Sequence, residues 1–435
     1  MMMNAKQLAE KACTFLSAST DPYHAVQNSI KILEAAGFRR IVPFGGDNNN
    51  TTGTTVTTTD GATTPSTICP GGKYYYTVQS STLVAFAVGS KVVPSNSNFG
   101  FHIIGGHTDS PNIRIKPKSQ KVPKKANTTQ LSVECYGGGL WHTWFDRDLS
   151  ISGKVLLRSS STTPGSSNMI TQRLIQFKEP IARVSTLCIH LQTPTEREAF
   201  KINKEDHTSP IIATTATTSD NEGKEIIASS VLEQITNSND PWLQGQEPML
   251  LQRIASELNV NVTQIADYDL SLYDIQPSTI GGIQQEFIYS GRLDNLATVF
   301  NAVTALSLQN LEESSDVAMV VCFDHEEVGS VSANGAGSPV LHEAVQYVST
   351  SLGNATSIQH STSIQKSFCL SIDQAHAVHP NYMSKHDPIH SPMMNGGIVV
   401  KSNANQRYAT NSLTGFVIRE LGRICNVPIQ EFSGT

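Results

Sequence analysis

The chain has 435 residues, more than one ordinary hydrophobic core accommodates, so we expect two domains. Hydrophobic residues make up 38% and charged residues 16%, and the net charge of -6 argues against nucleic acid or an anionic membrane as a partner. Seven cysteines without a C-x-x-C pair suggest reduced thiols in the cytoplasm, and no stretch reaches the length of a membrane span.

The first elements precede a histidine and an aspartate. The N-terminal segment "MMMNAKQLAEKACTFLSAST" lacks the apolar core of a signal peptide and predicts a short amphipathic helix. The stretch "FGFHIIGGHTDSPN" (99–112) predicts a short strand that ends at its two glycines. Three tracts rich in Thr, Ser and Asn are expected to be surface loops: 47–67, 159–168 and 213–225.

The middle and the end of the chain follow different patterns. Short alternating apolar runs, "QLSVECYG", "SGKVLLR" and "TLCIHLQT", predict a β-rich unit. From residue 290 to 309 the apolar spacing becomes helical, and strands are expected at 317–323 and 367–373. Strands that alternate with helices predict a mostly parallel sheet covered on both faces. The expected fold class is therefore an α/β/α sandwich interrupted by a β-rich insertion.

Acidic and histidine side chains gather where these strands end or where the helix begins: His107, Asp109, Asp294, Glu326, Glu327 and Asp373. In open α/β sheets the carboxyl ends of the strands form a crevice where ligands bind. Carboxylates crowded in one place repel each other, and a divalent metal compensates them. One imidazole with several carboxylates and no thiolate suits Zn or Mn.

Each of these residues also has an ordinary structural explanation. A His-x-Asp pair commonly forms only a hydrogen-bonded turn, and Asp294 is a typical acid at a helix start. His376 and His379 are compatible with hydrogen-bonded core histidines. Competing catalytic motifs are absent from the sequence: there is no H-E-x-x-H, no G-x-S-x-G, and "YGGGLW" lacks the Lys-Ser/Thr of a phosphate loop. The shared position at strand ends favours the metal site.

Six separated motifs resemble the aspartyl aminopeptidase family of zinc metallopeptidases: "GGHTDSPN", "YGGGLWHTWFDRDLSISGKV", "SGRLDNLAT", "DHEEVGS", "AHAVHPNY" and "NQRYATN". The resemblance implies a peptidase domain over 1–110 and 283–435, C-terminally incomplete, with a dimerisation domain inserted at 111–282. It implies a tetrahedral dodecamer that removes N-terminal Asp or Glu from peptides. The alternative is a vacuolar-type aminopeptidase with neutral preference.

The resemblance also implies a role for each site residue. His107 and Asp373 bind one zinc, Asp294 bridges two zincs, and Glu327 binds the second. Glu326 is the general base, and Asp109 supports the ligands from behind. Two further residues concern the substrate: His190 reaches a neighbouring subunit's active site, and Lys401 pairs with an acidic substrate side chain.

The family also has a late histidine that binds the second zinc. This sequence continues from "NVPIQEF" to "SGT" at residue 435, and no residue aligns with that histidine. We therefore expect two zinc ions per subunit in the family and at most one tightly bound in this chain, unless His376 or His379 takes the position. A catalytically dead assembly subunit is the alternative from another functional class.

Overall fold

The computed structural model describes residues 4–43, 56–57, 67–94, 98–121, 126–158, 170–214, 227–354 and 356–433. Most of the three tracts predicted as surface loops, 47–67, 159–168 and 213–225, lies outside these ranges. The chain divides into two units, residues 1–372 and 373–435. Within the described ranges, no helix combines the length and apolarity needed to cross a bilayer.

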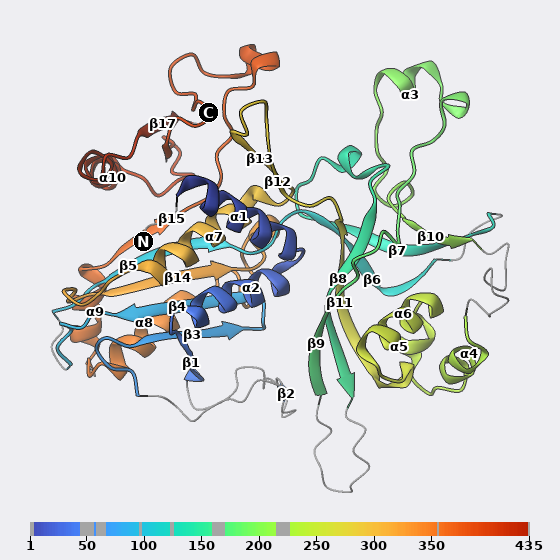
Figure 1. The fold of residues 1–435 in the computed structure, drawn as a ribbon, viewed down its shortest axis with the longest axis horizontal. Coiled ribbons are helices and arrows are strands. Elements are labelled where there is room, and N and C mark those ends of the chain that lie inside the picture. Colours follow the sequence, from blue (N-terminus) through green and yellow to red (C-terminus); the bar gives the residue numbers. More distant parts are fainter. Residues whose placement is uncertain are drawn as a thin grey trace, which may run out of the picture. The chain divides into compact units, whose positions relative to one another are not determined.

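The first unit contains a six-stranded sheet with the order β1-β3-β4-β14-β5-β15 (Figure 1). Its strands are β1 (Arg39–Arg40), β3 (Lys73–Val78), β4 (Thr82–Val88), β14 (Val317–Phe323), β5 (Phe101–His107) and β15 (Phe368–Ser371). The pairs β1–β3, β14–β5 and β5–β15 are parallel, but β4 is antiparallel to both of its neighbours.

The sheet is therefore mixed, which corrects the expectation of a mostly parallel one. A tight hairpin joins β3 to β4, with positive φ angles of 50° at Gln79 and 64° at Ser80. Such turns are usually marked by Gly, Asn or Asp, and this one has none of them. The sequence "VQSST" therefore does not indicate a hairpin.

Helices cover both faces of this sheet, as predicted. One face packs against α1 (Ala5–Ala18), α2 (Pro22–Ala35) and α7 (Leu293–Leu308), and the other against α8 (Val340–Ser351), beside which lies α9 (Ser357–Gln365). Alternate residues of β14 enter the two cores, Met319 and Val321 on one side and Val320 and Cys322 on the other. All seven residues of β14 are consequently buried, which explains its unbroken apolar sequence.

The strand β5 continues through the two glycines that were expected to end it. Gly105 and Gly106 pair with Val321 and Cys322 of β14, and the strand ends only at His107. A Cβ on Gly106 would lie 3.2 Å from Cγ2 of Thr298 in α7. The second glycine therefore lets the start of α7 approach the sheet next to His107.

A second, seven-stranded sheet in the first unit has the order β10-β7-β6-β11-β8-β9-β2. Its strands are β10 (Ile211–Thr214), β7 (Thr128–Tyr136), β6 (Asn112–Lys121), β11 (Ile265–Asp274), β8 (Leu149–Arg158), β9 (Ile170–Gln176) and β2 (Val56–Thr57). All neighbouring pairs are antiparallel except β2 with β9. The β-rich middle of the chain is therefore a separate antiparallel sheet.

This second sheet has its own hydrophobic core. Its strands pack against three helices, α4 (Ser229–Thr236), α5 (Pro241–Gln244) and α6 (Pro248–Leu258), and the fully buried side chains of that core lie between residues 113 and 272. After β11 a small hairpin, β12 (Thr279–Gly281) and β13 (Phe287–Tyr289), leads into α7.

One predicted strand of the middle region does not form. "TLCIHLQT" (186–193) contains only the short 3₁₀ helix η3 (Ile189–Leu191), followed by α3 (Pro194–Glu198). The alternating Leu187, Ile189 and Leu191 are 49%, 62% and 70% exposed. Alternation alone predicts a strand only where a neighbouring strand is available to pair with it, and no described strand pairs here.

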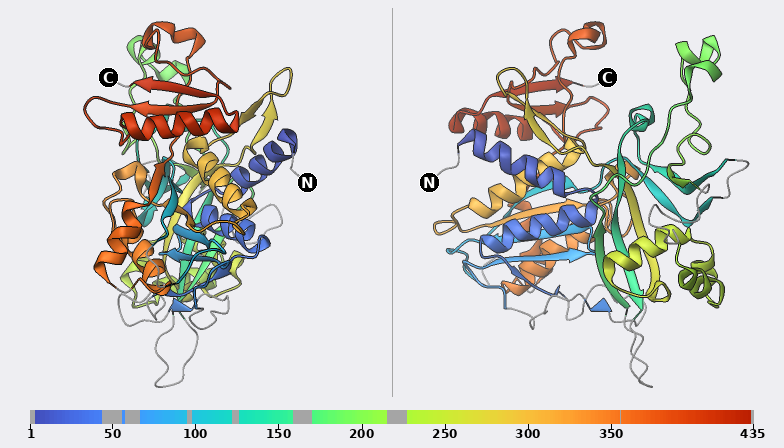
Figure 2. Two further views of the ribbon diagram at one scale, coloured as in Figure 1. Left: turned by 90° about the vertical axis from the view of Figure 1, so that its left-hand side faces the viewer. Right: turned by 45° about the vertical axis from the view of Figure 1, so that its right-hand side comes forward.

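The second unit is a β-α-β motif. The strands β16 (Ile398–Ser402) and β17 (Ile429–Ser433) are parallel, and α10 (Ser412–Cys425) connects them and lies alongside both (Figure 2). The 3₁₀ helix η6 (Pro380–Lys385) precedes them. Asn411 caps α10 by accepting hydrogen bonds from the amides of Leu413 and Thr414.

Candidate active site

His107 is the last residue of β5 and is only 4% exposed. Its Nδ1 lies 3.0 Å from the backbone oxygen of Asp109, and because that oxygen only accepts, Nδ1 carries the proton. The other nitrogen, Nε2, lies 3.4 Å from Oδ1 of Asp294 and 3.6 Å from Oε2 of Glu326. The imidazole is thus held from behind and presents Nε2, its unprotonated nitrogen, to a group of carboxylates, as metal-binding histidines do.

Asp109 is completely buried behind this imidazole. Its Oδ1 lies 3.3 Å from Nδ1 of His107 and accepts a 3.1 Å hydrogen bond from the Glu326 amide. Its Oδ2 accepts from the Glu327 amide at 3.1 Å and from the Tyr136 hydroxyl at 2.7 Å. Burial alone would raise the pKa of Asp109, but the contacts with His107, Tyr136 and Glu327 outweigh it and lower the pKa. An ionised Asp109 therefore fixes both His107 and the turn that carries the two glutamates.

Glu326 and Glu327 open a 3₁₀ turn, η5 (Glu326–Val328), which follows β14 after Asp324 and His325. Burial, together with the charges of Asp294, Asp109 and Glu326, raises the pKa of Glu327 to about 7, although His107 opposes the shift. Gly137, at the end of β7, makes room for Glu327: its φ is +79°, and a Cβ there would lie 3.0 Å from Cβ of Glu327. The end of the antiparallel sheet therefore touches the glutamate turn.

Asp294 lies in the first turn of α7, as predicted, but its backbone is not helical, and the peptide bond to Asn295 is cis. The Ser110 hydroxyl donates to the Asp294 carbonyl at 2.6 Å. Arg292, with a positive φ of 59°, donates to the carbonyls of Ser19 and Leu16 at 3.1 and 3.2 Å. This segment is thus anchored to the C-terminal end of α1, which holds the Asp294 carboxylate near His107.

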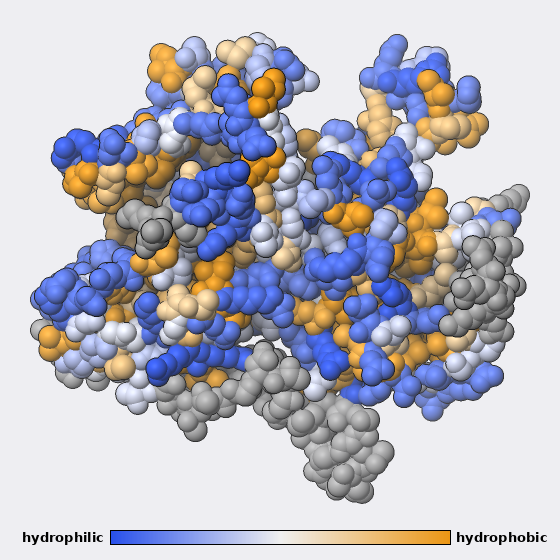
Figure 3. All heavy atoms as spheres, viewed as in Figure 1, coloured by the Kyte–Doolittle hydropathy of each residue, from blue (hydrophilic) through white to orange (hydrophobic). Residues whose placement is uncertain are grey.

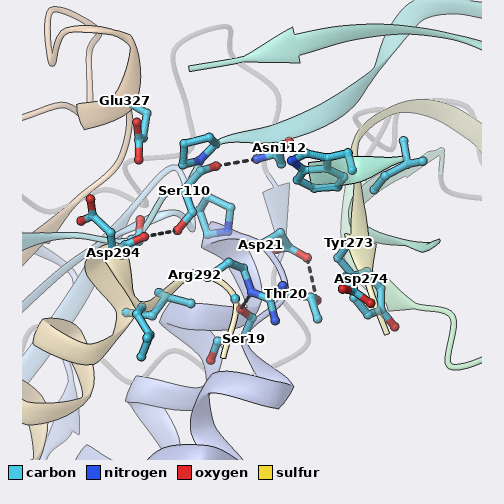
Figure 4. Close-up of a pocket in the computed structure, with 18 of the residues that line it drawn as sticks. Ser19, Thr20, Asp21, Ser110, Asn112, Tyr273, Asp274, Arg292, Asp294 and Glu327 are labelled. Atoms are coloured by element: carbon cyan, nitrogen blue, oxygen red, sulfur yellow. Dashed lines mark hydrogen bonds between the residues drawn. The ribbon is translucent and has the colours of Figure 1, made fainter. Parts of the chain in front are cut away.

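A cavity of about 470 Å³ adjoins these groups, and Asp294 and Glu327 line one side of it (Figure 4). The opposite side comes from the antiparallel sheet and its loops: Trp144, Arg147, Tyr273 and Asp274. Arg147 is held in the wall by a 3.2 Å ion pair with Asp274 and a 3.1 Å hydrogen bond to Gln276. The cavity is large enough for a few amino-acid residues.

Of the remaining predicted site residues, Asp373 and Lys401 belong to the second unit and His190 to the first. Asp373 opens the second unit and directly follows Ile372, whose amide donates to the Gly105 carbonyl of β5 at 2.8 Å. Within the second unit, Nζ of Lys401 lies 3.4 Å from Oδ2 of Asp373 and donates to the Gln374 carbonyl at 2.6 Å. His190 lies in the exposed 3₁₀ helix η3 and not in a buried strand.

The two alternative histidines have local contacts in the second unit. The ring of His376 packs edge-on against Phe432, with centroids 5.3 Å apart. Nδ1 of His379 accepts a hydrogen bond from the Asn381 amide at 3.2 Å, and its ring packs against Tyr382. The expected core environment is wrong for both histidines, because His376 and His379 are exposed.

The sequence analysis missed three groups that build the site: Tyr136, Arg292 and Ser110. Tyr136 stands before the glycines of "YGGGLW" at the end of a predicted strand, and this position was a usable signal. The side chains of Arg292 and Ser110 donate hydrogen bonds to distant backbone carbonyls, and no local sequence pattern indicates such contacts.

The donors of this site suit a zinc ion. Imidazole nitrogen and carboxylate oxygen are both ligand types that zinc accepts. Burial first, and then the neighbouring carboxylates, raise the pKa of Glu327, and a cation would relieve this crowding of negative charge.

The chain matches one family model over residues 15–434, described as aminopeptidase I zinc metalloprotease (M18). It is 41% identical to a probable aspartyl aminopeptidase of Ricinus communis, with 96% of this chain and 82% of that protein aligned. It is 36% identical to an aspartyl aminopeptidase of Dictyostelium discoideum, over 98% of this chain and 84% of that protein.

Solved structures of similar proteins share the fold. One, the Ape4 and Nbr1 complex, contains a chain 36% identical to this one, with a TM-score of 0.81 and coverage of 99% of this chain and 77% of that chain. A chain of the mApe1 dodecamer from Saccharomyces cerevisiae is 25% identical, with a TM-score of 0.77 and coverage of 99% of this chain and 86% of that chain. An M18 aminopeptidase from Thermotoga maritima, at 17% identity and a TM-score of 0.73, shows the same fold, with coverage of 99% of this chain and 84% of that chain.

Proposed function

This chain belongs to the aminopeptidase I zinc metalloprotease family (M18), and from that premise we propose that it releases N-terminal Asp or Glu from peptides. The observation that carries the proposal is the cluster at the strand ends of the mixed sheet. There the buried His107 meets Asp294 and Glu326, and Asp109 fixes the ring from behind.

The proposed ligand set follows from this cluster. His107 and Asp294 would hold one zinc together with Asp373, which follows the strand β15 beside β5. Asp294 and Glu327 would hold a second zinc. When bound, zinc supplies a Lewis acid that lowers the pKa of a water molecule and polarises a carbonyl.

The chain's own groups would divide the remaining work. Glu326 is half-exposed, with 49% of its side chain accessible, and accepts the proton of the attacking water as general base. Its neighbour Glu327 turns toward the cavity instead (Figure 4). The shared anchor of both amides on Asp109 keeps these two roles apart.

Lys401 supports the acidic preference. It is the cation next to Asp373 in the second unit, so an acidic substrate side chain there would meet a positive charge beside a proposed metal ligand. A charge-assisted hydrogen bond of this kind contributes about 1.5–3 kcal/mol.

The proposed domain organisation assigns 1–110 and 283–435 to the peptidase domain and 111–282 to dimerisation. Apolar side chains are exposed on the segment around η3 and α3, where Figure 3 shows hydrophobic residues among polar ones: Leu187, Ile189, Leu191 and Phe200. Such a segment fits an interface between copies of this chain. We propose that His190 reaches a neighbouring active site there, within a dodecamer located in the cytoplasm.

Turnover of Asp-, Glu- and Leu-anilides by the purified, zinc-loaded protein tests the proposal. We expect Asp and Glu to be cleaved faster than Leu, because only they pair with Lys401. Faster cleavage of Leu would instead indicate a neutral, vacuolar-type preference. An absence of turnover on all three substrates, with assembly intact, would indicate a dead assembly subunit.

A further inference from the structure

The antiparallel sheet contributes one side chain directly to the support of His107. Tyr136 is the last residue of β7 and is 9% exposed, and its hydroxyl lies 2.7 Å from Oδ2 of Asp109. The other donors to Asp109 are His107 and the amides of Glu326 and Glu327, which all belong to the ends of β5 and β14. Tyr136 therefore links the second sheet to the metal site of the first.

We propose that Tyr136 is a positioning residue of the zinc site, and that Arg114 holds Tyr136 in place. The inference rests on the proposed zinc site. Tyr136 donates to the same Asp109 oxygen that accepts the Glu327 amide, so its hydroxyl fixes the rotation of the carboxylate. That rotation sets both the orientation of the His107 ring and the position of the glutamate turn.

Arg114 lies over the face of Tyr136. Its guanidinium carbon is 3.5 Å from the ring centroid, a short cation–π contact. The geometry follows from the strand register: Asn112 of β6 pairs with Tyr136 of β7, so Arg114 is its diagonal neighbour. Among the described residues, the buried Nε of Arg114 has no hydrogen-bond partner, so the ring is a main contact of this end of the side chain.

The hydroxyl of Tyr136 keeps its proton at neutral pH, because burial and the charge of Asp109 raise its pKa. It is thus a permanent donor to Asp109. Without it, the Glu327 amide is the one donor to Oδ2 of Asp109 that remains among the described residues, and the carboxylate gains rotational freedom. Supporting groups behind metal-bound histidines typically change metal affinity by about ten- to a hundredfold.

The first test is zinc affinity of Tyr136→Phe, which removes only the hydroxyl. Zinc competition with a chelator and the visible spectrum of the Co²⁺-loaded protein report the site without requiring turnover. We expect affinity to fall about ten- to a hundredfold and the Co²⁺ spectrum to change. The matched control is Tyr268→Phe, since Tyr268 is a buried tyrosine of the same sheet whose hydroxyl bonds to Gln246.

Tyr268→Phe should cost comparable thermal stability and leave zinc affinity unchanged. Wild-type zinc affinity in Tyr136→Phe, or equal affinity losses in the two variants, would overturn the inference. If the wild-type protein binds zinc but cleaves neither Asp nor Glu substrates, the proposed function fails and this inference stands. If the wild-type protein does not bind zinc, both fail.

The second test addresses Arg114. Arg114→Lys keeps a cation above the ring and should retain most of the zinc affinity, whereas Arg114→Met should lose part of it. If Arg114 acts through Tyr136, the double variant with Tyr136→Phe binds zinc no more weakly than Tyr136→Phe alone. Additive losses would show that Arg114 acts on the site independently, and no loss in Arg114→Met would exclude it as a support.

Discussion

Gly137 approaches Glu327 so closely that a Cβ at position 137 would lie 3.0 Å from the Cβ of that glutamate. The backbone of Gly137 also has a φ of +79°, which non-glycine residues adopt at a cost of about 1–2 kcal/mol. The end of one sheet therefore determines where a proposed ligand of the other sheet can lie.

Gly137→Ala is expected to displace Glu327 and to lower both zinc affinity and the free energy of unfolding. Chelator competition and urea unfolding measure the two effects. Gly138→Ala is the control, because a Cβ built there meets no atom of the described, non-adjacent residues within 4 Å. Equal zinc affinities and equal free energies of unfolding in the two variants would show that the close approach of Gly137 to Glu327 does not affect the site.

Asp109→Asn should weaken zinc binding by about ten- to a hundredfold. Both carboxylate oxygens accept hydrogen bonds, so either orientation of the amide places an NH₂ group against a donor. Asp324→Asn is the control: burial raises the pKa of Asp324, and an amide oxygen can still accept from the His325 amide. Similar zinc affinities for these two variants would contradict the role of Asp109.

The adjacent glutamates should respond differently to removal of their charge. Glu326→Gln should retain zinc and lose turnover by about a hundredfold or more, because general-base catalysis contributes on that order. Glu327→Gln should lose zinc affinity instead. Zinc content and steady-state rates of both variants decide the question, and a reversal of the two phenotypes would exchange the assigned roles.

Lys401→Met should lower kcat/KM for Asp substrates by about one to two decades, since the lost contact contributes about 1.5–3 kcal/mol. The value for Leu substrates should change little. Lys385→Met, in the 3₁₀ helix of the same unit, is the control and should affect neither substrate. A parallel loss on Asp and Leu substrates would assign Lys401 to stability.

A contribution of His190 to a neighbouring site predicts complementation between two inactive variants. His190→Ala lacks the residue donated to the neighbour, and Glu326→Gln lacks its own base. Subunits mixed under conditions that allow exchange should regain measurable activity, because a His190→Ala site receives His190 from its Glu326→Gln neighbour. Mixed assemblies that remain inactive, or a fully active monomer, would exclude the contribution in trans.

The sequence alone was sufficient to predict the elements whose buried residues recur at a regular spacing. The unbroken apolar run at 317–323 corresponds to β14, and the helical spacing after residue 290 corresponds to α7. Both patterns arise because residues close together in the sequence are buried together. The polar residues at the strand ends were identifiable for the same reason, because acidic residues that closely follow a fully buried strand are conspicuous in the sequence.

Tertiary structure decided how the strands pair and which residues support the proposed metal ligands. The hairpin between β3 and β4 lacks a typical turn residue, and the alternating segment at 186–193 has no described strand to pair with. The Asp109 carboxylate accepts a hydrogen bond from the amide of Glu326, which lies 217 positions later in the sequence, and Tyr136 donates to Asp109 from another sheet. Local patterns record which residues are buried, but these contacts depend on how distant strands are ordered, and only the folded chain sets that order.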